Sequence, residues 1–283
     1  MTGQKALMAS YGPILEALYD RYNGPAFLTP DPVEVLYPYG ETAEREVVAF
    51  IAASLAYGRA GLIKRSLSRI LPLLGPSPRS FLLAADRPSL TERFRGFRHR
   101  FTDEEDLVDL LFALGALIRD RGSLERAFAD GLSPQGRSHL SLVPFVGLIR
   151  SRAGGRPNSL LADPSGGSAC KRLHLFLKWM VRRDAIDPGG WTVLRPASLV
   201  VPLDRHMHRI GLELGLTMRR QADLKAALEM TEAFAHVCPD DPARYDFVLT
   251  RFGIRNDLAM ESLFDLCRKG GHRPFPSSPL TRS

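Results

Sequence analysis

Residues with the potential for covalent chemistry gather around a lysine in the second half of this sequence. Gly166, Gly167 and Ser168 precede Lys171 and Arg172 at the expected start of a helix. A glycine-rich approach leaves backbone N–H groups uncovered, and together with the helix dipole these donors favour an anion such as a phosphate. The amine of Lys171 is a candidate nucleophile, because a lysine can form a Schiff base with a carbonyl carbon.

A carboxylate stands 33 residues further along, behind a run of apolar residues. Residues 199–203 are apolar, so they deliver Asp204 to the start of the next expected helix. Such an aspartate could cap the first turn of that helix, which is worth about 1 kcal/mol. On Asp204 alone the cap is the favoured interpretation, and the motif that surrounds this residue is what points to chemistry.

The helix that starts at Lys171 is apolar except along one face. Lys171, His174, Lys178 and Arg182 recur at helical spacing, while nearly all of the intervening side chains are apolar. This pattern predicts a buried helix with one basic stripe toward a cleft or toward solvent. Lys178 and Arg182 could then contact a phosphate backbone, or they could belong to an ordinary solvated face.

The residues after the apolar run form a motif in which Asp204 is followed by His206 and Arg209. This motif resembles the signature of the helix-hairpin-helix DNA glycosylase superfamily, which includes endonuclease III and the archaeal 8-oxoguanine glycosylases. The glycine hairpin before Lys171 matches that signature with looser spacing and without the usual Leu-Pro-Gly-Val-Gly. The long separation between Lys171 and Asp204 is similar to that in the archaeal group.

The resemblance implies a role for each of these residues. Lys171 would attack the sugar of a nucleotide flipped out of the stack, and Asp204 would stabilise the positive charge on that sugar. His206 and Arg209 would support the pair, although His206 could equally fill a core site. The residues that would hold the DNA backbone are those of the hairpin and the following helix: Gly166, Gly167, Ser168, Arg172, Lys178 and Arg182.

An earlier segment has a second correspondence with these glycosylases. A strongly apolar helix expected at 41–57 breaks before Arg59 and is followed by a helix with a basic face. This arrangement is similar to the early helix pair of the superfamily, where the break supplies a side chain that probes the DNA stack. Here that side chain would be Tyr57 or Arg59, with Lys64 and Arg65 near the backbone. Alternatively, Tyr57 packs in the core of a tight turn between helices.

Four stretches are similar to a bacterial family that is catalogued only as a domain of unknown function. They are 52–59, 171–182, 202–204 and 241–247. Because they are spread over nearly the full length, the chain is identified as a member of this family. Membership by itself implies no activity.

The elements that must position these residues are predicted to be helices. Helical periodicity dominates and sustained strand patterns are nearly absent, which predicts an all-α fold. The resemblance implies the glycosylase arrangement of two helical lobes flanking a cleft. We expect one domain over 1–268, with its terminal helices packed together, and a frayed tail over 269–283. The expected helices are 14–22, 41–57, 60–74, 106–120, 123–130, 141–150, 171–183, 205–214, 221–238 and 241–252.

Charge and composition limit the partners. Lys and Arg number 38 against 31 Asp and Glu, giving a net charge of +7, which modestly favours a polyanionic partner such as double-stranded DNA. The three cysteines are scattered, so we expect no disulfide framework, metal site or cofactor. With no signal peptide or membrane span expected, the protein should be cytoplasmic. We expect a monomer.

The sequence therefore predicts a DNA base-excision glycosylase, with lyase activity through a Schiff base at Lys171 as an additional possibility. Two alternatives stay open at this point. The first is a protein that binds nucleic acid with the same fold but without the chemistry. The second is an enzyme that uses the lysine for imine chemistry on a small carbonyl compound.

Overall fold

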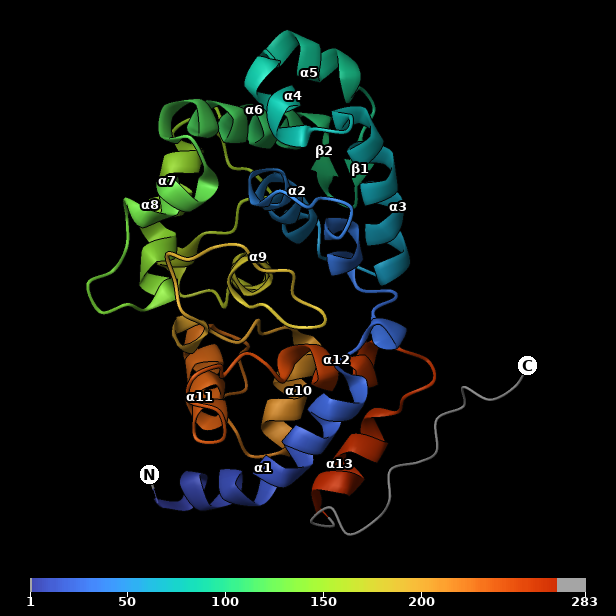
Figure 1. Cartoon of the computed structure of the whole chain (residues 1–283), viewed down its shortest axis with the longest axis vertical. Coiled ribbons are helices and arrows are strands. Elements are labelled where there is room, and N and C mark those ends of the chain that lie inside the picture. The colour runs from blue at the N-terminus through green and yellow to red at the C-terminus, as the bar shows by residue number, and fades with distance from the viewer. Residues whose placement is uncertain (1, 269–283) are drawn as a thin grey trace.

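The computed structural model describes residues 2–268, which form thirteen α-helices, several short 3-10 turns and one two-stranded hairpin (Figure 1). The predicted all-α class is thus confirmed, while the predicted tail at 269–283 lies outside the described residues. The helices of the first half are α1 (Thr2–Tyr22), α2 (Thr42–Ser54), α3 (Ala60–Ile70), α4 (Pro78–Ala84), α5 (Arg87–Arg93), α6 (Glu104–Arg121), α7 (Leu124–Ala129) and α8 (Ser138–Arg150). The helices of the second half are α9 (Lys171–Val181), α10 (Arg205–Glu213), α11 (Leu224–Ala235), α12 (Asp246–Ile254) and α13 (Met260–Arg268).

The helices fall into two groups that are not simple halves of the chain. Helix α1 packs against α11, α12 and α13, so the N-terminal helix completes the group formed by the C-terminal helices. Helices α4 to α8 pack with one another and with α2. In Figure 1 the first group lies below and the second above, with α9 between them. The helix that begins with Lys171 is therefore at the centre of the molecule.

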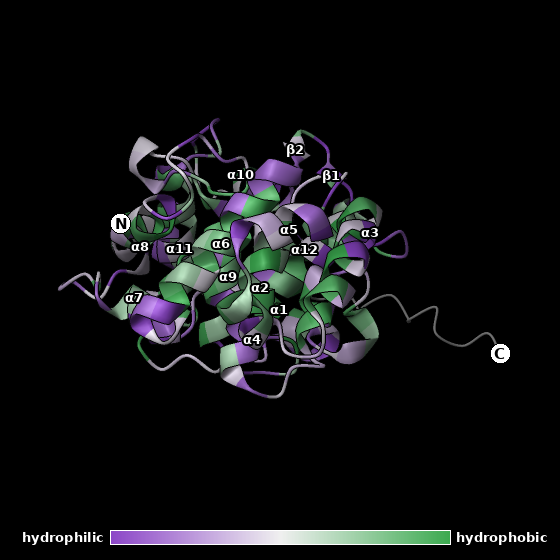
Figure 2. Cartoon of the chain, turned by 90° about the horizontal axis from the view of Figure 1, so that it is seen from above, coloured by the Kyte–Doolittle hydropathy of each residue, from purple (hydrophilic) through white to green (hydrophobic). Residues whose placement is uncertain are grey.

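Helix α2 is buried around nearly its whole circumference, as its apolar sequence predicts. Every residue from Glu46 to Ser54 is buried, and α2 packs along α9. Phe50 of α2 packs edge to face against Phe176 of α9, with ring centroids 5.0 Å apart. Figure 2 shows the resulting apolar interior with polar segments around it.

The elements that the sequence pattern does not predict are the helices α4, α5 and α13 and the two strands of the hairpin. Helices α4 and α5 have seven residues each, which is too short for an apolar stripe to repeat. Pro78 reads as the end of the preceding helix, but it starts α4, because a proline fits the first turn of a helix, where its missing N–H is not needed. The strands β1 (Arg98–His99) and β2 (Thr102–Asp103) pair antiparallel in a hairpin of only two residues per strand.

Candidate functional site

The structure brings Lys171 and Asp204 together. The Nζ atom of Lys171 lies 4.0 Å from Oδ2 of Asp204, and the two side chains are 29% and 21% exposed. Both charged groups can therefore meet a ligand from solvent while still facing each other. The carbonyl oxygen of Ala56 lies 3.4 Å from Nζ of Lys171 and accepts a hydrogen bond from it. The pair thus sits where α9, α10 and the end of α2 converge.

Asp204 holds its place by capping α10. Its Oδ1 atom accepts hydrogen bonds from the backbone N–H groups of His206 and Met207, at 2.8 and 2.9 Å. The two bonds fix the orientation of the carboxylate, because they tie one oxygen to the first turn of the helix. Oδ2 is left to face Lys171. Capping and a catalytic role, which the sequence offers as alternatives, are therefore compatible in one side chain.

The hairpin before α9 exposes its backbone. Gly166 and Gly167 are exposed, and a Cβ atom at either position would meet no atom within 4 Å. Gly167 has φ +75°, a left-handed conformation that favours glycine. The N–H of Leu224 donates to the carbonyl of Gly167 at 2.9 Å, which fixes the hairpin to the start of α11. This exposed backbone lies a few residues ahead of α9, whereas Ala169 and Cys170, which directly precede the helix, are buried.

Arg172 points into the protein. Its guanidinium donates to the backbone carbonyls of Ser54 at 2.6 Å and Ser159 at 2.9 Å, and it lies 5.1 Å from the ring centroid of Tyr57. Burial lowers the pKa of Arg172. These contacts join α9 to the end of α2 and so help to position the Ala56 carbonyl beside Lys171. The described contacts of Arg172 are thus internal and do not include an open anion site.

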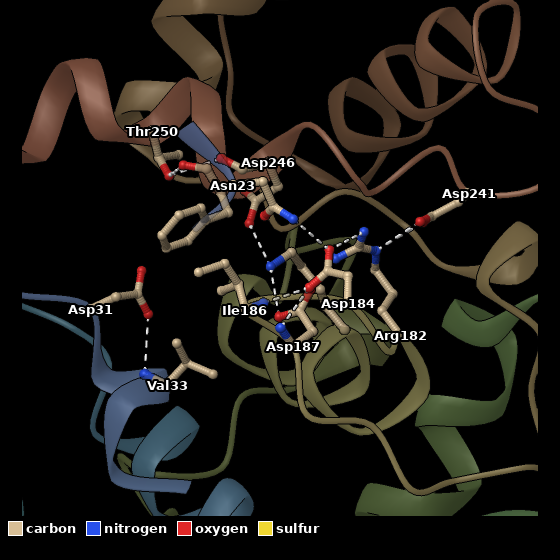
Figure 3. A network of polar contacts seen from close by, with 12 residues as sticks. Asn23, Asp31, Val33, Arg182, Asp184, Ile186, Asp187, Asp241, Asp246 and Thr250 are labelled. Carbon is tan, nitrogen blue, oxygen red and sulfur yellow. Dashed lines mark hydrogen bonds and ion pairs between the residues drawn. The ribbon is translucent and has the colours of Figure 1, made fainter. Parts of the chain in front are cut away.

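The interpretation of Lys178 and Arg182 as DNA contacts is wrong. Each side chain is only 2% exposed. Lys178 Nζ lies 3.1 Å from Asp187 Oδ1, and Arg182 pairs with three carboxylates (Figure 3), those of Asp184, Asp187 and Asp241. The loop after α9 folds back and covers these cations, so the basic stripe faces neither a cleft nor solvent. The helical pattern does not reveal this burial, because it shows neither how the loop with Asp184 and Asp187 folds back nor that Asp241 comes close.

Asp246 belongs to this region, although the sequence leaves it outside the catalytic set. It lies at the first position of α12 and is buried, with Oδ2 3.6 Å from Lys178 Nζ. Burial raises the pKa of Asp246 to about 6, against the opposing effect of Lys178. The negative charge of Asp204 also raises the pKa of Asp246, and the positive charge of Lys171 lowers it. The only sequence signal is an acid ahead of a strongly apolar segment.

His206 and Arg209 occupy different surroundings. A Cβ atom at Gly253 would lie 2.3 Å from Nδ1 of His206, so the imidazole packs directly on the backbone of α12. Arg209 is about half exposed and forms an ion pair of 3.1 Å with Glu261 of α13. His206 therefore helps to set the position of α10 against α12. Arg209 lies on the surface, where it connects α10 to α13.

The residues in and after the break between α2 and α3 differ in exposure and in their partners. Tyr57 is half-buried, and its hydroxyl donates to the carbonyl of His99 at 2.9 Å. Arg59, Lys64 and Arg65 are exposed on α3 or just before it, and Lys64 pairs with Glu34 at 3.1 Å. Tyr57 thus holds the β1–β2 hairpin, while the three basic side chains are on the surface.

Residues 2–268 contain neither a cluster of metal-binding side chains nor a membrane-spanning helix. No group of three or more His, Cys, Asp or Glu side chains in this range is arranged to hold a metal ion. No helix in the same range is long and apolar enough to span a bilayer. A surface hollow of about 740 Å³ lies at the turn 215–221 and is lined by Arg219 and Glu229, among others, but not by Lys171 or Asp204.

The fold and the site together define an all-helical protein in which a lysine and an aspartate, each at the start of a helix, face one another. A family model described as "Protein of unknown function (DUF2400)" matches residues 31–255, and the chain belongs to this family. The predicted membership of an uncharacterised family is thereby confirmed. No curated protein and no solved structure matches the chain.

Proposed function

We propose that this protein is a DNA base-excision glycosylase that also cleaves abasic sites through Lys171. The observation that carries the proposal is the approach of Lys171 Nζ to within 4.0 Å of Asp204 Oδ2 across 33 positions of sequence. An amine and a carboxylate that share a partly exposed position are the two groups that this reaction requires. The resemblance of the surrounding motif to the helix-hairpin-helix glycosylases supports the same reading.

The proposed reaction uses both groups on C1′ of a flipped nucleotide. The neutral amine of Lys171 attacks C1′, a C–N bond forms, and the glycosidic bond breaks, with its electron pair leaving on the base. Asp204 stabilises the positive charge that builds on the sugar during this step. A proton then passes from the nitrogen to the ring oxygen O4′, the C1′–O4′ bond breaks, and a protonated Schiff base forms between Lys171 and C1′. Transfer of a C2′ proton to the released base then lets the C3′–O bond break, and the 3′ phosphate leaves with its electron pair.

The surroundings of the pair suit a phosphate backbone. The exposed backbone at Gly166 and Gly167, a few residues ahead of α9, is open to an anion. Arg59, Lys64 and Arg65 are exposed in or after the break between α2 and α3, and Ala56 in the same break contacts Lys171 through its carbonyl. The net charge of +7 adds attraction to any polyanion.

Borohydride trapping tests the proposal, because it reduces the Schiff base to a stable amine. Wild type, Lys171→Gln and Asp204→Asn would be incubated with duplexes that contain an abasic site, 8-oxoguanine or uracil. We expect a covalent adduct with wild type, none with Lys171→Gln, and a strongly reduced yield with Asp204→Asn. Lys5→Gln serves as the control, because it removes an exposed lysine of α1 that lies outside the proposed DNA-binding residues.

Three results would contradict the proposal in different ways. An adduct that persists in Lys171→Gln would assign the chemistry to another amine. Binding of DNA without an adduct or base release on any duplex would favour a non-catalytic binding protein. Absence of any DNA binding, with borohydride trapping of a small carbonyl compound at Lys171, would favour an imine-forming enzyme.

A further inference from the structure

The β1–β2 hairpin carries an exposed aromatic side chain at its tip. Arg98 pairs with Asp103 and His99 with Thr102, so Arg100 and Phe101 form the two-residue turn. Phe101 is 67% exposed, and Arg100 adopts φ 56°, a conformation that non-glycine residues rarely take. Arg98 and Arg100 are exposed as well. An aromatic ring is thus presented to solvent beside two cations.

The ring of Phe101 continues a stack that begins next to the candidate site. It stacks on Tyr57, with ring centroids 5.0 Å apart and an interplanar angle of 26°. The guanidinium of Arg172 lies 5.1 Å from the centroid of that same Tyr57 ring, and Arg172 directly follows Lys171. Tyr57 also follows Ala56, whose carbonyl contacts Lys171 Nζ. Phe101 is therefore the outer end of a stack whose inner end is Arg172, the residue next to Lys171.

The hairpin is held firmly in this position. The hydroxyl of Tyr57 donates to the His99 carbonyl at 2.9 Å and also bonds to Thr102. His99 in turn bonds to Ser66 at 2.8 Å and to the Tyr57 carbonyl at 3.0 Å. These bonds fix both strands, and the tip residue Phe101 is left largely uncovered by the other residues within 2–268.

Charges of both signs lie near the tip, and the exposed cations there are Arg98 and Arg100. The carboxylates of β2 and of the start of α6 have partners within the protein: Asp103 caps α6 through the N–H of Asp106, Glu104 accepts from the N–H of Gly96, and Glu105 pairs with Arg156. The stem of Arg100 covers Gly58, in the break between α2 and α3. Exposed arginines beside an open aromatic ring suit a stacked base flanked by phosphates.

We propose that Phe101 stacks on a nucleobase of DNA bound at the Lys171–Asp204 pair, and that it fills the gap left in the duplex by an extruded or missing nucleotide. The proposal rests on the proposed function. It differs from the expectation that Tyr57 or Arg59 enters the DNA stack: Tyr57 serves as the platform, and the residue that enters is Phe101. An aromatic ring wedged into an unstacked step costs less where a nucleotide is already missing.

Equilibrium binding in a Lys171→Gln background tests this inference without covalent chemistry. Fluorescence anisotropy would give Kd values for a duplex with a tetrahydrofuran abasic analogue and for the intact duplex. Phe101→Ala should weaken binding to the abasic duplex by roughly 5- to 150-fold, the range for loss of one stacked base, and should remove most of the preference over intact DNA. Phe101→Trp should retain that preference. Met218→Ala removes another highly exposed side chain, at 86%, and should leave both Kd values unchanged.

A local probe adds a second readout. 2-Aminopurine placed beside the abasic position should lose fluorescence when the Lys171→Gln protein binds, because a ring stacked on it quenches emission, and should keep it with Phe101→Ala. Equal Kd values and equal quenching for both proteins would overturn the role of Phe101 while leaving the proposed function intact. Failure of the Lys171→Gln protein to bind either duplex, if wild type also fails, would overturn both.

Discussion

Lys178 Nζ and Asp246 Oδ2 lie 3.6 Å apart inside the protein and join α9 to α12 through a buried ion pair. Lys178 also contacts Asp187 at 3.1 Å. Burial would lower the pKa of Lys178, but the carboxylates of Asp187 and Asp246 outweigh burial and hold it above its ordinary value. Lys171 and Lys178 are two turns apart on α9, so the same helix supplies the candidate nucleophile and this internal cation.

Loss of the buried cation should be costly. Lys178→Met leaves Asp187 and Asp246 without their shared partner in a region closed to solvent, and we expect a loss of about 3–5 kcal/mol in the free energy of unfolding. Urea denaturation measures it. Lys64→Met is the control, because Lys64 is 55% exposed and its pair with Glu34 should contribute less than about 1 kcal/mol. Equal effects of the two substitutions would contradict the assignment.

Asp246 should make stability depend on pH. Its pKa is raised by burial from 3.8 to about 6, so the folded protein holds this proton more tightly than the unfolded chain does. Its contribution to stability is therefore complete below about pH 4 and is lost as the pH rises through 6, with a slope of up to about 1.4 kcal/mol per pH unit. The charged neighbours that shift the pKa of Asp246 are Lys178, Lys171, Asp204 and Asp31.

The difference between wild type and Asp246→Asn isolates that contribution, because other carboxylates titrate in both proteins. Urea denaturation at a series of pH values should show a stability difference that changes across the interval from about pH 4 to 6. Asp120→Asn, which alters an exposed ion pair with Arg152, should give a nearly constant difference. A constant difference for Asp246→Asn as well would refute the raised pKa.

A single methyl group at Gly253 should disturb the site from the far side of α10. The Cβ atom of Gly253→Ala would lie 2.3 Å from Nδ1 of His206, so α10 and α12 must move apart. Overpacking of this kind costs about 1–3 kcal/mol. Because Asp204 begins α10, the borohydride trapping yield should fall as well. The matched control is Gly147→Ala, which adds a methyl group in α8 where no atom lies within 4 Å, and it should stabilise the protein by about 0.4–1 kcal/mol.

Glu46 should be needed as a carboxylate acceptor inside the protein. It accepts from the N–H groups of Leu124 and Glu125 at 2.8 and 3.1 Å and from Trp191 Nε1 at 2.9 Å. Burial raises its pKa to about 7. Glu46→Gln would turn an amide N–H toward at least one of these donors, at a cost of about 1–3 kcal/mol. Thermal and urea denaturation check this, with Glu92→Gln as an exposed control; an unchanged stability would show that the three donors do not require a carboxylate.

Local patterns in the sequence were enough for the helical class, for the buried helix α2 and for the two helix starts at Lys171 and Asp204. Helical periodicity repeats within one segment, and a cap such as Asp204 bonds to residues only two and three positions away. The resemblance to a family of unknown function also follows from the sequence, because it depends on residue identities alone. Short helices such as α4 and the two-residue strands carry too little pattern to be found.

Tertiary structure decided what each charged side chain does. Lys178 and Arg182 have the same spacing from Lys171 that a solvent-facing stripe would have, yet both are buried. Lys178 pairs with Asp187 of the following loop and Asp246 of α12, and Arg182 pairs with Asp184 and Asp187 of that loop and with Asp241, which precedes α12. The 4.0 Å approach of Lys171 to Asp204 likewise depends on how α9 and α10 pack. A sequence gives the type of each charge and its neighbours along the chain, but burial and ion pairing depend on neighbours that only folding brings near.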